Sequence, residues 1–154
     1  MSQLTTRSAT INDLVILLQF EQGIIKTERP FDPTLKPDPI NYYDLKAYIE
    51  SPDIEVAVAE WDGEIVGSGY ALIRTANPYY KHNRYSYLGF MYVKPEHRGR
   101  GVNKAILDAL MQWSKSKGIT EIRLEVYDDN IAAKKAYEKA GFKGHMLEMR
   151  MEIR

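Results

Sequence analysis

The sequence predicts an α/β (α+β) fold, in which a mixed sheet of six to seven strands carries helices on both faces. Two observations lead to this prediction. Apolar residues alternate with a period of two in several segments, and they recur at helical spacing in the segments before, between and after them. The 154 residues also suit one domain, residues 1–154, large enough to bury a sizeable core.

The N-terminal third is expected to hold one strand and two helices. Residues 3–9 read as a short strand, and the cap-and-acid spacing of residues 10–13 starts a helix. Within that helix Glu21 is the one position that departs from the apolar pattern. The prolines of residues 28–39 exclude a helix there and predict a loop. A short helix is expected over residues 42–50.

The rest of the chain alternates strands with two more helices. The Asp62-Gly63 pair favours a two-residue hairpin turn, because both residues accept positive φ angles. Gly118 is the expected C-terminal cap of the longer helix. The predicted elements are a strand from Ile54, strands over 65–74 and 85–93, a helix from Val102, a strand over 122–126, a helix over 131–140, and one or two closing strands within 142–154.

Composition excludes several kinds of protein. Acidic and basic residues balance at 21 each, which gives no net field to favour nucleic acid or an anionic membrane. The absence of cysteine excludes disulfides, zinc–thiolate sites and a cysteine acyl-enzyme. The three histidines are isolated, so no metal site is expected. Without an apolar leader at the start, a cytoplasmic location is the expectation.

The stretch from Met91 to Val102 is the most informative of the chain. A strand runs into a loop containing Gly99 and Gly101, and an amphipathic helix follows. The first turn of a helix offers unpaired N–H groups, the glycines allow close approach of a phosphate, and Arg98 and Arg100 add positive charge. A pyrophosphate site is one interpretation, and a solvated basic turn is the other. The spacing excludes both a Walker loop and a dinucleotide fingerprint.

A second motif spans Asn130 to Phe142. Its helix places a single phenol, Tyr137, on one face with small residues at 133, 136 and 140. Small neighbours leave room for a ligand, although they also suit close packing of a helix on a sheet. Tyr137 is therefore either a functional phenol or a core aromatic whose hydroxyl is bonded.

In this order and spacing, the two stretches resemble the GNAT superfamily of N-acetyltransferases. Arg98 and Gly101 match its pyrophosphate-binding motif, and the second segment is matched by Asn130, Ala133, Tyr137, Gly141 and Phe142. The resemblance implies a mostly antiparallel sheet whose strands 4 and 5 splay apart. It also implies an acyltransferase that moves an acetyl group from acetyl-CoA to an amine within a ternary complex. A homodimer is suggested as well, because dimers are common in that family.

The resemblance also implies individual roles. Backbone groups of Met91 and Val93 would bond the pantetheine arm, and an N–H near Tyr92 or Val93 would stabilise the oxyanion. Tyr137 would protonate the departing thiolate, which makes it the catalytic residue. The implied cofactor-binding set is Met91, Tyr92, Val93, Arg98, Gly99, Arg100, Gly101, Val102, Asn103, Asn130, Ala133 and Tyr137.

Two positions depart from the family pattern. Asn103 stands where a small residue is usual, and Gly89 stands where many members carry a glutamate as general base. Glu28, Asp32 and Tyr42 are the candidates for a replacement base; the alternative is that each is a solvated loop residue. The residues expected to bind the acceptor are Glu28, Arg29, Tyr42 and Tyr85.

Three functions remain open from the sequence. The first is acetylation of a primary amine of a small molecule or amino acid. The second takes a protein N-terminus or lysine as the acceptor. The third is a non-catalytic module that binds acetyl-CoA and regulates, which the missing glutamate at Gly89 motivates.

Overall fold

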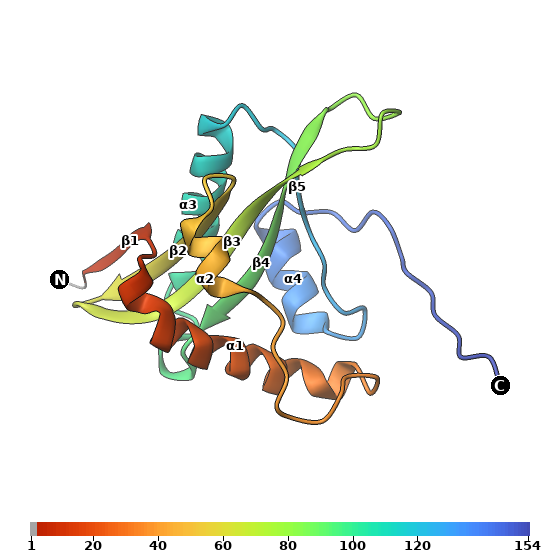
Figure 1. The fold of residues 1–154 in the computed structure, drawn as a ribbon, viewed down its shortest axis with the longest axis horizontal. Coiled ribbons are helices and arrows are strands. Elements are labelled where there is room, and N and C mark those ends of the chain that lie inside the picture. The colour runs from red at the N-terminus through yellow and green to blue at the C-terminus, as the bar shows by residue number, and fades with distance from the viewer. Residues whose placement is uncertain (1–2) are drawn as a thin grey trace.

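A computed structural model describes residues 3–154, and its centre is one mixed sheet of five strands (Figure 1). The strands follow the chain in the order β1-β2-β3-β4-β5. The first four pair antiparallel, and β5 joins β4 in parallel. Their bounds are β1 Leu4–Ser8, β2 Ile54–Trp61, β3 Glu64–Thr75, β4 Arg84–Val93 and β5 Ile122–Leu124.

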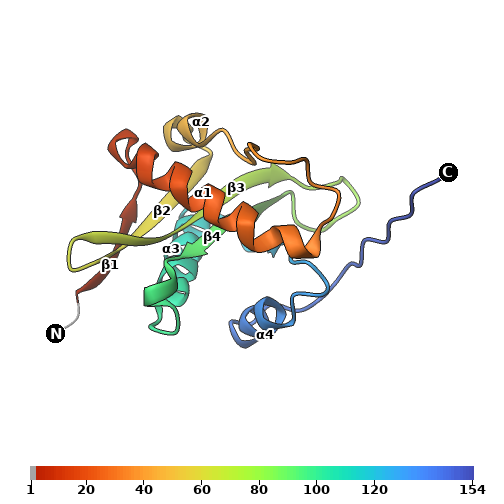
Figure 2. The ribbon, with the colours of Figure 1, turned by 90° about the horizontal axis from the view of Figure 1, so that it is seen from below.

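Four α-helices cover the two faces of the sheet. Figure 2 shows α1 (Leu14–Glu28) and α2 (Leu45–Glu50) on one face, with α3 (Val102–Ser116) and α4 (Ile131–Lys139) on the other. Alternate residues of β2 contribute to the two cores: Val56 and Val58 pack with α1 and α2, and Ala57 and Ala59 pack under α3. No helix of the described chain is long and apolar enough to cross a membrane.

Small residues on β3 let α3 lie very close to the sheet. A Cβ added at Gly69 would stand 2.7 Å from both Ile106 of α3 and the Met91 sulfur of β4. A Cβ at Gly67 would stand 2.7 Å from Val102, the first residue of α3. These glycines therefore fix where α3 begins, beside the end of β4.

Glu21, the exception to the apolar pattern of α1, is fully buried rather than exposed. Its carboxylate accepts hydrogen bonds from the N–H groups of Tyr42 and Tyr43, at 2.6 and 2.7 Å. A buried carboxyl group is tolerated when it is hydrogen-bonded, as one oxygen of Glu21 is; the other, Oε1, has no partner among the described residues. Glu21 thus ties the segment before α2 to the middle of α1.

The prediction of six to seven strands is not confirmed, because the sheet has five strands over residues 3–154. Residues 142–154 were expected to supply one or two closing strands, but in the described chain they form none and run away from the sheet (Figures 1 and 2). Pairing depends on a neighbouring edge as well as on alternation, and this segment lies beside none within its own chain.

Other boundaries shift by a few residues. After α1 a short 3₁₀ turn, Arg29–Phe31, accommodates Pro30 in its first turn, where the missing N–H costs no bond. Helix α2 begins at Leu45, because the Asp44 side chain accepts a hydrogen bond from Ala47 N–H at 3.2 Å. The hairpin turn at Asp62-Gly63 is confirmed, with φ angles of 52° and 86°.

Candidate active site

Strand β4 carries a bulge next to the site. Ser68 pairs with Tyr92 and Tyr70 with Gly89, so Phe90 and Met91 together oppose a single residue of β3. Phe90 takes a left-handed φ of 57°, unusual for a bulky side chain. The buried Ser68 hydroxyl donates to the Phe90 carbonyl at 3.0 Å, which satisfies a backbone group that the bulge takes out of register.

The bulge coincides with the point where β4 and β5 separate. Their parallel pairing ends at Leu88 and Leu124, whereas β4 continues to Val93 without a partner on that side among residues 3–154. A cavity of about 420 Å³ opens there, between α1, β4, the start of α3 and the segment from β5 to α4. Of the residues predicted for the site, those that line it are Met91, Tyr92, Val93, Arg98, Asn103, Asn130, Ala133, Tyr137 and Glu28.

The loop before α3 presents a cluster of free backbone donors. Within the described chain, the N–H groups of residues 99–104 donate to no protein acceptor. Gly99 and Gly101 have φ angles of 76° and 84°, which favour glycine, and a Cβ at either would meet nothing within 4 Å. Arg98 is held against β4 by its Nε, which donates to the Val93 carbonyl at 3.2 Å. Such a helix start suits an anion such as pyrophosphate.

The neighbouring predicted residues contribute in different ways. The Val102 side chain is buried in the core under α3, so only its backbone faces the loop. The Arg100 guanidinium lies 5.7 Å from the centre of the Trp61 ring and does not line the cavity. Asn103 does line it, so a side-chain amide takes the place usual for a small residue.

Helix α4 supplies the opposite wall. The Asn130 side-chain oxygen accepts a hydrogen bond from Ala133 N–H at 3.2 Å and caps the helix, which leaves the amide NH₂ as the group available to a ligand. The Tyr137 side chain reaches the cavity and packs edge-on against Phe142. Burial, and then the negative charge of Glu28, raises the pKa of Tyr137 and keeps its hydroxyl protonated.

Glu28, the last residue of α1, brings a carboxyl group to the same cavity. Burial raises its pKa, and the charge of Asp32 adds to this, whereas the nearby Tyr42 hydroxyl lowers it. The Tyr42 hydroxyl is itself buried near Glu28 but makes no hydrogen bond of standard geometry with any described residue, and Tyr42 does not line the cavity. Burial and the Glu28 charge raise the Tyr42 pKa as well, so Tyr42 stays protonated beside the carboxyl group.

The space next to Gly89 is filled from the neighbouring strand. A Cβ at Gly89 would stand 2.6 Å from the Tyr70 hydroxyl and the ring carbon that bears it. Burial raises the pKa of Tyr70 to about 12. A neutral phenol therefore occupies the volume that a longer side chain at position 89 would need.

Three residues considered for the acceptor side are engaged elsewhere. Arg29 bonds the Lys36 carbonyl and the Asp38 carboxylate, which ties its own loop together. Tyr85 lies at the start of β4, with the Arg123 guanidinium 4.0 Å from the centre of its ring. Neither lines the cavity. Asp32 bonds Thr34 and Tyr127, and these contacts lower its pKa.

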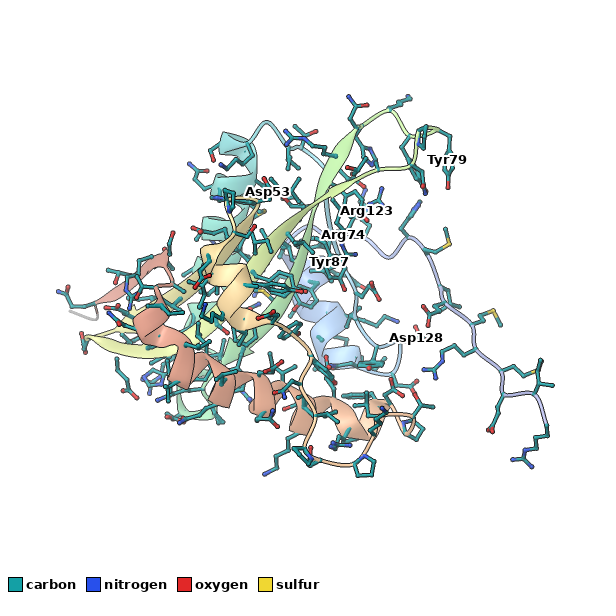
Figure 3. The ribbon with its side chains drawn as sticks, viewed as in Figure 1. Asp53, Arg74, Tyr79, Tyr87, Arg123 and Asp128 are labelled. Carbon is teal, nitrogen blue, oxygen red and sulfur yellow. The ribbon has the colours of Figure 1, made fainter. Side chains whose placement is uncertain are left out.

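Sequence reasoning missed the residues that follow β5. Glu125 and Tyr127 line the cavity, and the Glu125 carboxyl raises the pKa of Tyr87 on β4, after the larger effect of burial. Figure 3 shows Arg74 beside Tyr87, with the guanidinium 4.1 Å from the ring centre. Their position directly after β5 could have identified them, because β5 is parallel to β4 and ligands bind at the carboxyl ends of neighbouring parallel strands.

The fold and the cavity define a class of mixed α/β proteins in which a split pair of parallel strands faces a helix start with free N–H groups. The chain belongs to the acetyltransferase (GNAT) family, whose model matches residues 22–142.

Two relatives and two solved structures illustrate the likeness. Aminoglycoside N(6')-acetyltransferase type 1 of Stenotrophomonas maltophilia is 32% identical over 84 residues, 53% of this chain and 54% of the relative. Thialysine N-epsilon-acetyltransferase of Bos taurus is 36% identical over 73 residues, 47% of this chain and 42% of the relative. The chain therefore spans about half the length of these relatives.

The solved structures share the fold over nearly the whole chain. A predicted acetyltransferase with acetyl-CoA from Clostridium acetobutylicum matches with a TM-score of 0.76 and 20% identity, covering 97% of this chain and 96% of that one. A transcriptional regulator from Bacillus halodurans matches with a TM-score of 0.78 and 23% identity, covering 98% and 100%. Neither likeness extends the conclusion beyond fold.

Proposed function

We propose that residues 1–154 form one acetyl-CoA-dependent domain that transfers an acetyl group directly to the primary amine of a small molecule. One observation carries the proposal. A single cavity is lined by Arg98 and Asn103, which flank the free N–H groups before α3, and by Tyr137 and Glu28. An anion-binding end, a proton donor and a proton acceptor thus share one space.

The residues present fit acetyl-CoA, which would supply an activated thioester carbonyl. The N–H groups of residues 99–104 and the Arg98 guanidinium would bind the pyrophosphate. The unpaired side of β4 over residues 89–93 offers backbone groups to the amide-containing arm, as a further strand would. One N–H there would polarise the carbonyl as negative charge develops on its oxygen.

Glu28 and Tyr137 would handle the two protons of the transfer. An amine arrives largely as an ammonium ion and must lose a proton before its nitrogen can attack the carbonyl carbon. Glu28, whose raised pKa makes it a better base than an ordinary carboxylate, would take that proton directly or through water. As the carbon–sulfur bond breaks, the protonated Tyr137 hydroxyl would donate to the departing thiolate.

The acceptor in this proposal is a cationic amine rather than an acidic one. The acceptor end of the cavity is lined by the carboxyl groups of Glu28 and Glu125, while Tyr127 links it to Asp32 through a 3.0 Å hydrogen bond. These charges attract an ammonium group and repel carboxylates. The names of the two relatives above, an aminoglycoside and a thialysine acetyltransferase, support a small amine.

Calorimetric titration of the purified chain with acetyl-CoA is the first test, and we expect saturable binding of one ligand per chain. Turnover is then followed by CoA release, with a thiol reagent, across a panel of small amines; the chain has no cysteine to add background. Acetylation of peptides but not of free amines would overturn the small-amine acceptor. Binding without turnover on any amine would favour a regulatory module.

A further inference from the structure

A positively charged side chain, Arg74, lies on the sheet close to the acceptor end of the cavity but outside its lining. Arg74 stands near the end of β3, is exposed, and takes part in none of the ion pairs among the described residues. Its guanidinium lies 4.1 Å from the centre of the Tyr87 ring on β4. Stacking on a ring leaves the edge of a guanidinium, with its N–H donors, available to an anion.

The pattern of the strands shows which face of the sheet carries this pair. Leu88 packs in the core under α3, so its neighbour Tyr87 points to the opposite face, that of α1 and α2. Leu72 pairs with Tyr87 and packs on the same side, and Arg74 follows two residues later on β3. Arg74 therefore lies on the face of α1 and α2, at a point where the sheet is open to solvent.

Tyr87 connects Arg74 to the acceptor end of the cavity. Burial raises the pKa of Tyr87, and the carboxyl group of Glu125, which lies close to the Tyr87 hydroxyl, raises it further. Glu125 lines the cavity, whereas Arg74 and Tyr87 do not. Figure 3 shows Arg74 beside Tyr87 on the sheet. A free positive group and a negative group are thus separated by the length of one tyrosine side chain.

We propose that Arg74 determines specificity by binding a carboxylate of the acceptor, whose amine lies in the cavity beside Glu28 and Glu125. This inference rests on the proposed function and narrows the acceptor to an amine that carries a carboxylate at the far end of the molecule. Glu28 and Glu125 attract the ammonium group and keep the carboxylate out of the cavity, while Arg74 has the reverse preference. The charges therefore favour one orientation of such an acceptor.

A carboxylate fits this position better than a phosphate. Arg74 supplies one positive charge, which a carboxylate balances, whereas a phosphate monoester carries about −1.5 to −2 at neutral pH. The neighbouring guanidinium of Arg123 is already engaged, because its Nε donates to the Glu121 carboxylate at 3.2 Å. A planar carboxylate can also accept two parallel hydrogen bonds from the edge of one guanidinium.

Turnover of two matched series of linear amines tests this substrate class on the full chain. One series consists of ω-amino acids, and the other of n-alkylamines with the same number of carbons, so the members of a pair differ in a carboxylate in place of a methyl group. We expect the best ω-amino acid to exceed its alkylamine partner in kcat/KM by about tenfold or more. The preference should appear as a lower KM, since the carboxylate is bound away from the reacting atoms.

Two variants with the same change of charge separate Arg74 from a general electrostatic effect. Arg74→Gln should raise KM for the ω-amino acid until the preference is lost, while turnover of the alkylamine stays unchanged and shows that the variant is folded. Arg84→Gln is the matched control and should keep the preference, because Arg84 lies on the α3 side and donates to the Lys117 carbonyl at 2.7 Å. Arg74→Lys, which keeps the charge but not the paired donors, should keep part of it.

The possible outcomes distinguish this inference from the proposed function. Equal kcat/KM in the two series, or a preference that persists in Arg74→Gln, would overturn the inference and leave the small-amine proposal standing. Turnover of other small amines, but of neither series, would also overturn this substrate class alone. A chain that binds acetyl-CoA and turns over no amine would overturn the proposed function, and the inference with it.

Discussion

The two ends of the cavity differ in the chemical groups that line them: one is formed mainly by backbone groups and the other by side chains. The end expected to bind the cofactor consists mainly of backbone: the bulge at Phe90, the unpaired side of β4 and the free N–H groups of residues 99–104. The acceptor end consists of side chains, chiefly Glu28 at the end of α1 and Glu125 and Tyr127 in the segment after β5. Backbone donors can bind any ligand that presents phosphate groups to them. The side chains of the acceptor end, by contrast, can be substituted without disturbing the fold.

This difference teaches where specificity resides. The backbone-built end is fixed by packing, since Gly67 and Gly69 set the approach of α3 to the sheet. The acceptor end depends on the loop after α1, which Glu21 holds by accepting hydrogen bonds from Tyr42 and Tyr43 N–H. We therefore expect variants at the two ends to separate cofactor affinity from turnover.

The largest expected effect is on turnover, at Tyr137. Replacing Tyr137 with Phe removes the proton donor but keeps the ring that packs on Phe142, so kcat should fall by about 10²–10⁴-fold. Acetyl-CoA affinity, measured by calorimetry, should change little. Tyr79→Phe, at an exposed tyrosine that does not line the cavity, is the control and should keep full activity. A Tyr137→Phe variant with normal kcat would remove Tyr137 from the mechanism.

A large loss of acetyl-CoA affinity is expected at Arg98. Arg98→Glu puts a negative charge where the pyrophosphate should bind, and we expect about 100-fold weaker binding, or about 2.7 kcal/mol. Arg100→Glu is the matched control, because that guanidinium lies over Trp61 outside the cavity. Its effect on calorimetric affinity should be several-fold at most. Equal losses in both variants would mean that the loop acts only through its net charge.

As the proposed general base, Glu28 should cause the fall of kcat/KM at low pH, the acid limb of the pH profile, when it becomes protonated. Its pKa lies above the usual 4.5, so kcat/KM should fall as the pH drops through this raised value. Glu28→Gln should lose that limb and about tenfold or more in kcat/KM at neutral pH. Asp32→Asn is the control: it should keep the limb but move it to lower pH, because the charge of Asp32 adds to the raised pKa of Glu28. An unchanged limb in Glu28→Gln would exclude Glu28 as the base.

The raised pKa of Glu28 also affects stability, but in the opposite direction: the ionised form that is needed for activity disfavours the folded state. A carboxyl group whose pKa is raised on folding stabilises the fold least when it is ionised, so its contribution is lost as the pH rises through the folded pKa. Glu28→Gln should therefore unfold at a higher temperature than the wild type at neutral pH. The difference should shrink below the usual pKa of 4.5. Thermal melts across the pH range measure it.

The smallest expected effect comes from Gly69. A Cβ there would stand 2.7 Å from Ile106, so Gly69→Ala should cost about 1–3 kcal/mol of unfolding free energy in urea titrations. It should also weaken acetyl-CoA binding a few-fold by moving the start of α3. Gly144→Ala is the control, since its Cβ would meet nothing within 4 Å. A stable Gly69→Ala variant would mean that α3 adjusts freely.

The sequence predicted the backbone-built parts well. Local signals marked the α3 start, the Asp62-Gly63 turn and nearly every element, because glycines, caps and periodicity act over a few residues. The place of Glu125 in the cavity was not predicted, and Glu21 was interpreted only as an exception to the apolar pattern of α1. The residues that each of them contacts are distant in sequence. The closing strands predicted within residues 142–154 are absent from the structure for the same reason, since a strand also needs a sheet edge to pair with, and alternation in the sequence does not reveal one.

Tyr70 on β3 and Gly89 on β4 face a space that has room for only one large side chain, from one strand or the other. With the Tyr70 hydroxyl 2.6 Å from any Cβ at position 89, a glutamate introduced there alone would meet the ring and strain the sheet. Paired with a small residue at position 70, the same glutamate would have room. The two sites should behave as a reciprocal exchange in a double-mutant cycle, each substitution harmful alone and tolerated together. Relatives that place a carboxylate on this strand should accordingly carry a compact residue across from it.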